Sequence, residues 1–414
     1  MTAPLVEDAR PVRPSVNEGS LSRRGRILLW AFQMADRDWQ GRGLTFLTPD
    51  RQAHDFGPAS PERAVLDIRD WRFFRRILAG GAIGLAESYV AAEWVTPDLA
   101  RTLIVLADNF ERLGRLTSGN AAIRAFNWAV HNLGRLNTRA GAKRNIVAHY
   151  DLGNDFYGRW LDPSMTYSSA LWTRPDQALE AAQREKYAAL AAAVDLQPHH
   201  RVLEIGCGWG GFAEYAAKEI GCHVTGLTLS PSQRDFAIAR LARAGLSDRV
   251  DIRLQDYRDT PETYDRIVSI EMFEAVGEKW WPTYFQTLHD RLTSDGKAGL
   301  QIITIREDLF EAYRREVDFI QKYVFPGGML PTETRLDRLA ADHGLSVSGR
   351  LRFGQDYART LSLWLKRFDE TGGGPGPEFT RLWRFYLAYC EAGFTTARTD
   401  VIQLTLTKTP ATDL

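Results

Sequence analysis

The chain has 414 residues, with 52 Lys plus Arg balanced by 52 Asp plus Glu, and three cysteines. This length allows two domains with cores of their own. Three cysteines without a C-x-x-C pair exclude a disulfide scaffold and a thiolate zinc site, and we expect no metal. No apolar run approaches the roughly 20 residues that cross a bilayer, and no signal-peptide core is seen. The sequence therefore predicts a cytoplasmic protein, which must reach any lipid from the membrane surface.

Charge is distributed unevenly along the chain. Residues 1–150 carry 21 Lys plus Arg against 15 Asp plus Glu, whereas the remainder carries 31 against 37. Much of the basic excess lies in residues 111–148, where seven Lys or Arg follow Glu111 without another acid. One face of a helix is marked there by Ile123, Phe126, Val130 and Leu133. Such a basic amphipathic helix can lie on an anionic membrane, link two domains, or present a solvated basic face.

Four segments are expected along the chain. Residues 1–20 are rich in Pro, Glu, Ser and Asn, which predicts a disordered tail. Residues 21–110 predict a small α+β domain that associates with lipid, 111–148 a basic amphipathic linker, and 149–414 a larger α/β domain. The elements expected in the small domain are strands at 43–50 and 65–68 and helices at 71–78, 83–94 and 97–109.

The large domain is organised around residues 201–233. This stretch reads as an apolar strand, a turn with four glycines, a helix and a second apolar strand. Strands and helices continue to alternate after it, which predicts a doubly wound parallel sheet with helices on both faces. The strands expected after this stretch are 250–254, 264–270, 298–305, 345–353 and 401–407. The helices expected around it are 177–194, 234–244, 278–292, 307–324, 357–370 and 379–392.

The glycine turn predicts a cofactor site, because glycines let the backbone approach a ligand and the following helix presents free N–H groups. The dinucleotide pattern G-x-G-x-x-G begins at Gly206, but the second strand ends at 228–230 without the acid that binds the ribose of NAD. Glu204 instead precedes the glycines. An acid there suits the cationic S-adenosylmethionine, so we expect this cofactor on a Rossmann-like class I methyltransferase domain.

Several longer motifs narrow the function further. They are VLEIGCGWGGF, TLSPSQ, LQDYRD, YDLGNDFY with LDPSMTYSSALW, and YVFPGGMLPT. Taken together they resemble the cyclopropane-fatty-acid synthase family, which includes the mycolic acid cyclopropane synthases. The resemblance extends from about Gly43 to Leu406. It implies an enzyme that transfers a methyl or methylene group from S-adenosylmethionine to the double bond of an unsaturated acyl chain on a membrane phospholipid.

The resemblance also implies roles for individual residues. Glu204 would orient the methionine end of the cofactor, and Tyr257 would lie near the adenine. The full set of expected cofactor contacts is Tyr167, Ser168, Glu204, Gly206, Cys207, Gly208, Gly210, Thr228, Leu229, Ser230, Gln233, Asp256 and Tyr257. The family's bicarbonate site is implied at Glu274, Ile305 and Tyr357. Cys390 matches a cysteine often called the active-site residue, although a buried cysteine is more often a small apolar side chain.

Two residues depart from the pattern of the family. Ser169 stands where the bicarbonate site has its cysteine, and Ile303 stands where it has its histidine. Either bicarbonate binds through fewer contacts, or the proton leaves by another route. The two departures are therefore compatible with a methyl-branched or methylene product, or with a step in furan fatty acid synthesis, as well as with a cyclopropane.

Methylation of an alkene makes a carbocation. The site must hold the methyl donor close to the double bond, exclude water and face the cation with aromatic rings. Glu274 is the carboxylate expected to hold or act as the base, unless it only stabilises the helix that follows. The aromatic residues expected to line the pocket are Tyr150, Phe156, Tyr157, Trp172, Phe273 and Tyr323.

The expected partners are unsaturated acyl chains and a phospholipid membrane, with the protein peripherally bound at its inner face. A homodimer and a separate reductase are compatible with this interpretation. No nucleic acid is expected, because the chain has no base-flipping motif such as N-P-P-Y. Two other classes of protein stay open as alternatives. A small-molecule methyltransferase would need a polar acceptor, and the intact glycine turn argues against a membrane-binding protein that has lost its activity.

Overall fold

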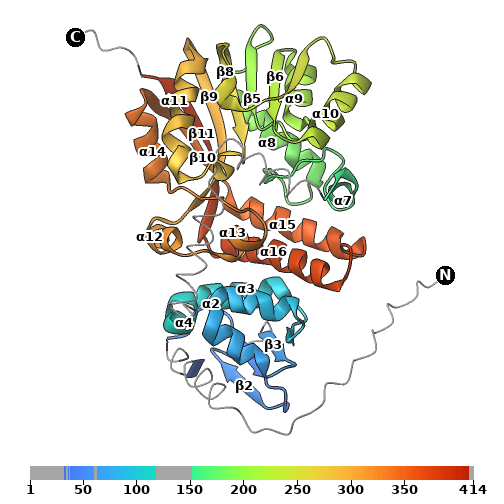
Figure 1. Cartoon of the computed structure of the whole chain (residues 1–414), viewed down its shortest axis with the longest axis vertical. Helices are drawn as coiled ribbons and strands as arrows, with labels where there is room; N and C mark the ends of the chain where they lie inside the picture. The colour runs from blue at the N-terminus through green and yellow to red at the C-terminus, as the bar shows by residue number, and fades with distance from the viewer. Residues whose placement is uncertain (1–31, 34–35, 37, 60–62, 118–151, 410–414) are drawn as a thin grey trace, which may run out of the picture.

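The computed structural model describes residues 32–33, 36, 38–59, 63–117 and 152–409. The predicted tail at 1–20 and most of the predicted basic segment at 111–148 lie outside the described residues. Figure 1 shows three layers, which are an N-terminal α+β part, a pair of long helices, and a large sheet with its own helices. Of the helices described, none is both long and apolar enough to cross a membrane.

The N-terminal part contains a four-stranded sheet with the order β2-β1-β3-β4. Its elements are β1 (Leu44–Leu47), β2 (Ala53–Phe56), β3 (Ala64–Ile68), α2 (Arg72–Val90), β4 (Trp94–Val95), α3 (Leu99–Asp108) and α4 (Phe110–Thr117). The two helices predicted at 71–78 and 83–94 form one kinked helix, α2, in which Gly81 has φ 57° and ψ −129°. Trp94 does not end a helix as predicted, but pairs with Ile68 in the sheet.

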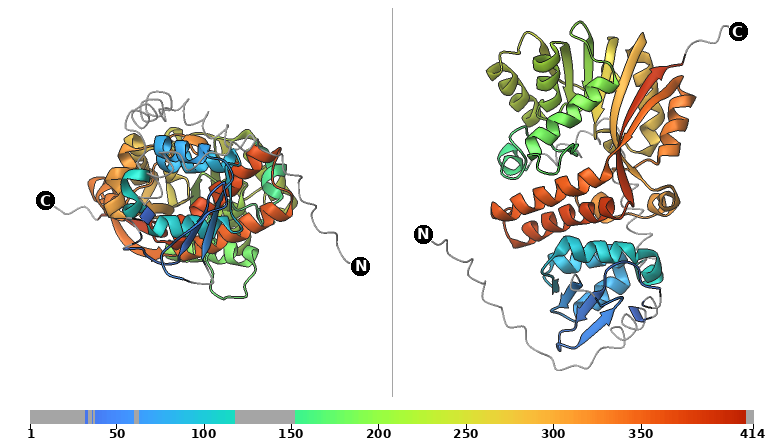
Figure 2. Two further views of the ribbon diagram at one scale, coloured as in Figure 1. Left: turned by 90° about the horizontal axis from the view of Figure 1, so that it is seen from below. Right: turned by 180° about the vertical axis from the view of Figure 1, so that it is seen from behind.

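The middle layer consists of α15 (Gly354–Glu370) and α16 (Pro377–Thr395), which lie side by side between the other two layers in both views (Figures 1 and 2). Helix α16 packs against α2 and α3. The guanidinium of Arg381 donates to the carbonyl oxygens of Tyr89 and Trp94, at 2.5 and 2.9 Å. The N-terminal part is thus attached to the rest of the molecule through α16.

The large sheet has seven strands in the order β10-β11-β9-β8-β5-β6-β7. Strands β5 to β9 run parallel, as predicted. Strand β11 runs antiparallel to β9 and β10, so the predicted wholly parallel sheet is wrong there. Hydrophobic patterning marks a buried strand but not its direction. The strands are β5 (Arg201–Ile205), β6 (His223–Thr228), β7 (Val250–Leu254), β8 (Tyr264–Ile270), β9 (Leu292–Ile305), β10 (Leu345–Arg352) and β11 (Thr399–Lys408).

Helices cover both faces of this sheet. Val202 and Leu203 follow each other in β5 and therefore point to opposite faces. Val202 packs in a core with α8 (Leu179–Ala193) and α10 (Pro231–Arg243). Leu203 packs in a second core with α11 (Trp281–Arg291) and α14 (Glu333–Asp342). The remaining helices are α7 (Asn154–Gly158), α9 (Gly211–Tyr215), α12 (Glu307–Arg315) and α13 (Phe319–Tyr323).

Two helices differ from the sequence prediction. The single helix predicted at 307–324 is split into α12 and α13. Asp318 starts the second helix, because its side chain accepts from the backbone N–H of Gln321 while the Gln321 side chain accepts from that of Asp318. Helix α14 was not predicted, since its exposed face is strongly charged and its buried residues are few, namely Leu336 and Ala340.

Candidate active site

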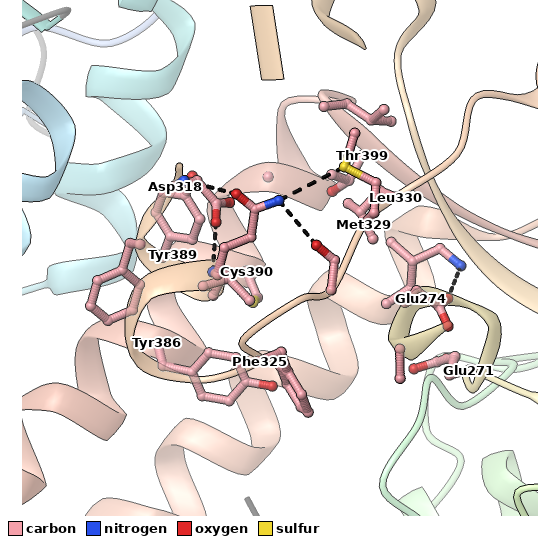
Figure 3. A pocket seen from close by; sticks show the side chains of 18 of the residues that line it. Glu271, Glu274, Asp318, Phe325, Met329, Leu330, Tyr386, Tyr389, Cys390 and Thr399 are labelled. Carbon is pink, nitrogen blue, oxygen red and sulfur yellow. Dashed lines mark hydrogen bonds between the residues drawn. The ribbon is translucent and has the colours of Figure 1, made fainter. Parts of the chain in front are cut away.

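A continuous cavity of about 920 Å³ links the large sheet to the N-terminal part. One end is lined by the turn that follows β5, and the other by apolar residues that include Ile77, Gly80 and Leu103 of α2 and α3. The middle is lined by residues drawn in Figure 3, from α13, the loop after it and α16. This lining suits a polar cofactor at one end and a long apolar chain at the other.

The glycine turn forms the cofactor end of the cavity. Gly206 and Gly208 have φ of 84° and 52°, which favour glycine. A Cβ on Gly206 would lie 2.7 Å from the Cγ of Met272, whereas a Cβ on Gly208 would meet nothing within 4 Å. The N–H of Cys207 donates to the carbonyl of Leu227 at 2.8 Å and ties the turn to β6. The turn therefore exposes bare backbone to the cavity.

Glu204 lies on β5 behind this turn and is 3% exposed. Its carboxylate accepts from the N–H of Ala213, but Oε2 has no hydrogen-bond partner among the described residues. Burial raises the pKa of this carboxyl to about 8, against the opposing attraction of Lys186. A buried carboxylate oxygen without a partner, in the wall of a cavity, is suited to receive a cationic ligand.

The other predicted cofactor residues are distributed as follows. Those that line the same cavity are Tyr167, Ser168, Cys207, Thr228, Leu229, Gln233, Asp256 and Tyr257. Two predicted contacts are not part of its lining. Ser230 caps α10 by accepting from the N–H of Gln233, and Gly210 packs against Ala237 of α10. Ser230 and Gly210 therefore support the cofactor site from outside the cavity wall.

A second carboxylate, Glu271, follows β8 (Figure 3). Its Oε1 accepts from the N–H of Ser169 and from Nε2 of Gln301, both at 2.8 Å, and its Oε2 accepts from the hydroxyl of Tyr357 at 2.6 Å. Burial raises the pKa of Glu271, whereas Lys186 and these hydrogen bonds lower it. Its φ of 50° is uncommon outside glycine and is typical of constrained functional positions.

Glu274 lies one turn further along the chain, in a 3-10 turn at Phe273–Ala275. Its Oε1 accepts from the N–H of Ile303 at 2.5 Å, and Oε2 has no partner among the described residues. Burial and the charge of Glu271 raise the pKa of Glu274 to about 8. Three donors stabilise the charged form of Glu271, whereas Oε2 of Glu274 has no partner among the described residues, so the two neighbouring carboxyls differ in what supports their charge.

Comparison with known proteins adds an independent observation. Residues 137–404 match the family model described as mycolic acid cyclopropane synthetase. The chain belongs to this family. It is 40% identical to the tuberculostearic acid methyltransferase UfaA1 of Mycobacterium tuberculosis over 84% of each chain. It is 36% identical to the cyclopropane-fatty-acyl-phospholipid synthase of Escherichia coli, over 80% of this chain and 84% of that protein.

The fold agrees with this assignment. The crystal structure of the mycolic acid cyclopropane synthase CmaA1, complexed with SAH and CTAB, is 31% identical, with a TM-score of 0.60 over 64% of this chain and 98% of that chain. The predicted class I methyltransferase fold and family are thus confirmed. The chain is an S-adenosylmethionine-dependent methyltransferase of the cyclopropane-fatty-acyl-phospholipid synthase type, and its reaction is the modification of an acyl chain.

The residues at the glycine turn fit the cofactor of this family. The open side of Gly208 leaves room for a ligand against the backbone, and the unpartnered Oε2 of Glu204 suits a positively charged group. Asp256 and Tyr257 line the same end of the cavity. We therefore expect Glu204 to hold the amino-acid end of S-adenosylmethionine and Tyr257 to lie at its adenine.

Bicarbonate, unlike S-adenosylmethionine, does not fit the residues that line its expected site. Ser169 and Tyr357, at two positions of the family's bicarbonate site, both donate to Glu271 in this chain. A bicarbonate placed there would compete with Glu271 for these donors and would lie beside its negative charge. The hydroxyl of Ser169 turns away to the carbonyl of Ala170 at 2.9 Å. The residues present do not fit bicarbonate, because the protein's own carboxylate takes its partners.

The other residues predicted to take part in catalysis have distinct surroundings. Ile305 and Tyr357 line the cavity, as does Cys390 (Figure 3). Burial raises the pKa of the Cys390 thiol far above its ordinary value, and Asp318 and Glu271 add to this effect. Cys390 is therefore a neutral thiol in the wall of the cavity, which does not favour it as a nucleophile. Ser169 is fully buried and lies behind this wall.

The predicted aromatic lining is wrong for five of its six residues. Tyr150 lies outside the described residues, and the other five do not line the cavity. Phe156 and Tyr157 pack in an aromatic cluster with Trp160, Phe273 stacks on Trp281, Arg359 covers Trp172, and Tyr323 is 38% exposed. The rings that line the middle of the cavity come from α16 and from α13 with the loop after it, and they are Phe319, Phe325, Phe385, Tyr386, Tyr389 and Phe394.

Two buried charged residues near the site were not predicted. Glu271 directly follows the strand predicted at 264–270, and an acid after a buried parallel strand lies where such sheets bind ligands. Lys186 falls within the helix predicted at 177–194. Its side chain is fully buried, and its Nζ donates to Oγ of Ser168 at 2.6 Å. Nothing in the spacing of α8 distinguishes this lysine from a solvated one.

Cofactor affinity should depend on the ionisation of Glu204. Because the pKa of this carboxyl is about 8, it is protonated in the free enzyme at lower pH. Binding a cation there requires that proton to leave, so the affinity for S-adenosylmethionine should rise by up to about tenfold per pH unit below pH 8. Isothermal titration calorimetry at several pH values would measure it. In Glu204→Gln, binding should be weaker and nearly independent of pH over this range.

Proposed function

We propose that this chain transfers a methyl group to the double bond of an unsaturated acyl chain of a membrane phospholipid, with Glu271 accepting the proton that leaves. The product we propose is a methylene or methyl-branched chain rather than a cyclopropane. The observation that carries the proposal is the carboxylate of Glu271, which lies in the cavity wall and is bound by Ser169, Gln301 and Tyr357. A fixed carboxylate in a largely apolar cavity is suited to general-base catalysis.

The cofactor, when bound, supplies an electrophilic methyl group. The residues of the cavity must then hold the alkene beside it and keep water away from the resulting cation. The rings of Tyr167, Tyr357 and Tyr386 line the cavity near Glu271, and the hydroxyls of Tyr167 and Tyr386 are joined by a hydrogen bond of 2.8 Å. Their faces can stabilise a cation without reacting with it.

Proton removal completes the reaction. The π electrons of the alkene would form the new carbon–carbon bond to the methyl carbon as its bond to the sulfonium sulfur breaks, with that electron pair staying on sulfur in the departing thioether. A hydride shift can then move the positive charge to the methylated carbon. Loss of a proton from the new methyl group then leaves a methylene group doubly bonded to the chain carbon, and the proton adds to the carboxylate of Glu271. A saturated methyl branch would require a separate reductase that donates a hydride to the methylene product, together with a proton from solvent.

The phospholipid substrate is supported by the size and lining of the cavity and by the relatives. Its far end is walled by Leu103, Leu106 and other apolar residues of the N-terminal part. The basic excess of residues 1–150 suits an anionic membrane surface. The Escherichia coli relative is named as acting on fatty-acyl phospholipid, and the relative UfaA1 is named for a methyl-branched acid. We propose peripheral binding at the inner face of the membrane.

The proposal is tested with vesicles of an oleoyl phospholipid and cofactor labelled in its methyl group. We expect label in the phospholipid acyl chain, and mass spectrometry with NMR of that chain should show a methylene or methyl branch. Transfer only to free fatty acid or acyl-CoA would overturn the phospholipid substrate. A cyclopropane as the sole product would overturn the proposed product. Transfer only to small polar acceptors would favour the small-molecule class.

A further inference from the structure

Lys186 is one of the largest fully buried side chains of the described residues, and the proposed reaction gives it no task. It lies on α8 and its Nζ donates to Oγ of Ser168 at 2.6 Å. The same Nζ lies 4.7 Å from the centre of the Tyr187 ring. Burying a lysine ammonium is costly unless other groups compensate its charge. A fully buried lysine that only fills space would be replaced at no loss by an apolar residue.

The charges that face Lys186 are all negative and come from three other parts of the chain. In order of their effect they are Glu271 after β8, Asp162 in the loop after α7, and Glu204 on β5. Among the described residues, none of these carboxylates approaches Nζ closely enough to form an ion pair. The ammonium of Lys186 therefore attracts these carboxylates at longer range rather than through one direct contact. In the protein interior, where the dielectric constant is low, such attraction is strong.

Lys186 and Glu271 are held by one framework of amides. The side-chain Nε2 of Gln403 donates to the backbone carbonyl of Lys186 at 3.0 Å and to Oε1 of Gln301 at 3.2 Å. The Nε2 of Gln301 donates in turn to Oε1 of Glu271 at 2.8 Å. On the other side, Ser168 joins Lys186 to Ser169, whose N–H also binds Glu271. The position of the ammonium relative to this carboxylate is thus fixed through both partners.

We propose that Lys186 is a positioning residue for methyl transfer, whose buried ammonium is the countercharge that favours the ionised form of Glu271, the form that can accept a proton. The inference rests on the proposed function of Glu271 as the base. The titratable groups that face Glu271 are Lys186 on α8, Tyr357 on α15, Cys390 on α16 and the neighbouring Glu274. Of these, Lys186 alone brings a positive charge.

These groups determine in which direction the pKa of Glu271 changes when the charge of Lys186 is removed. Burial raises the pKa of Glu271, and the charge of Lys186 is the largest influence that lowers it. Burial likewise lowers the pKa of Lys186 to about 7, against the attraction of Glu271, Asp162 and Glu204. The ammonium of Lys186 and the carboxylate of Glu271 therefore each stabilise the charged form of the other. Without the ammonium, the pKa of Glu271 should rise, and a larger fraction of the enzyme should carry a protonated base at neutral pH.

The variant Lys186→Met keeps the length of the side chain and removes its charge. The rising limb of the kcat–pH profile for methyl transfer to the acyl chain should move upward by about one pH unit or more, because an opposite charge in a buried site shifts a pKa by about 1 to 3 units. Activity should approach that of the wild type at high pH. If Lys186→Met has lower thermal stability but the rising limb of its kcat–pH profile lies at the same pH as in the wild type, the inference is contradicted.

A second readout does not need turnover. Infrared difference spectra recorded against pH show the protonated carboxyl band of Glu271 as the band that Glu271→Gln removes. That band should persist to higher pH in Lys186→Met than in the wild type, and an unchanged titration would overturn the inference. If wild type transfers no methyl group to acyl chains, the proposed function fails while this titration still decides the role of Lys186.

The milder variant Ser168→Ala covers the case in which Lys186→Met does not fold. It removes the hydrogen bond to Nζ and keeps the lysine. With one partner fewer, the ammonium is less favoured, so the limb and the infrared band should shift in the same direction by a smaller amount. A shift toward lower pH, or none, would contradict the inference.

Discussion

Replacing Glu271 with glutamine is expected to lower kcat for methyl transfer by at least about 100-fold, because general-base catalysis contributes about 10² to 10⁴. Glutamine keeps the shape of the side chain, and its Oε1 can still accept from the N–H of Ser169, while its Nε2 can donate to the hydroxyl oxygen of Tyr357. It cannot take up the proton. The affinity for S-adenosylmethionine should change little, since Glu204 carries that interaction. Single-turnover kinetics with labelled cofactor would measure the loss.

Glu274→Gln is the matched control, since it removes the neighbouring carboxyl of the same cavity wall. The pKa of Glu274 is about 8, so it is already neutral at pH 7, and an amide in its place changes the charge little. We expect kcat to stay within about tenfold of the wild type, well short of the loss expected for Glu271. The reverse order, with Glu274→Gln inactive and Glu271→Gln active, would assign the base to Glu274.

Replacing Gly80 with phenylalanine is expected to block the far end of the cavity. Gly80 lies on α2, lines the cavity, and a Cβ built on it meets nothing within 4 Å, so a larger side chain is directed into open space. One misfitting methylene in a hydrophobic pocket changes kcat/KM by about 10- to 200-fold. We therefore expect kcat/KM for long acyl chains to fall by about 100-fold or more, with a smaller loss for short chains.

The control for this experiment is Gly80→Ala. Alanine within a helix should stabilise α2 by about 0.5–1 kcal/mol relative to glycine and leave most of the cavity open. Its preference for chain length should match that of the wild type. If Gly80→Phe folds, binds the cofactor and still prefers long chains, the acyl chain does not extend into the N-terminal part.

Much of the fold could be predicted from local patterns. The strands β7 and β8 begin and end where their apolar residues do, and the glycines between β5 and α9 identify the cofactor turn. The direction of β11 could not be predicted, because patterning is the same for both directions of a buried strand. The continuity of α2 through Gly81 was also missed, since a glycine pair more often ends a helix than bends it.

The site was predicted less completely than the fold. Motifs identify the cofactor end, where most predicted residues line the cavity, but proximity in sequence misled the choice of aromatic residues. Four of the rings that line the middle of the cavity lie on α16, distant in sequence from the motifs used to choose the aromatic residues. The network of Glu271 joins residues 86 and 102 positions away along the chain, Tyr357 and Ser169. Such contacts depend on tertiary structure, which no local pattern shows.

The most direct test is the rate of methyl transfer to phospholipid acyl chains in buffer freed of carbon dioxide, measured before and after bicarbonate is added. Glu271 already binds the donors of Ser169 and Tyr357, so the chain carries its own base. We expect the same rate with and without bicarbonate. A rate that collapses in the depleted buffer and recovers when bicarbonate is added would contradict the role assigned to Glu271.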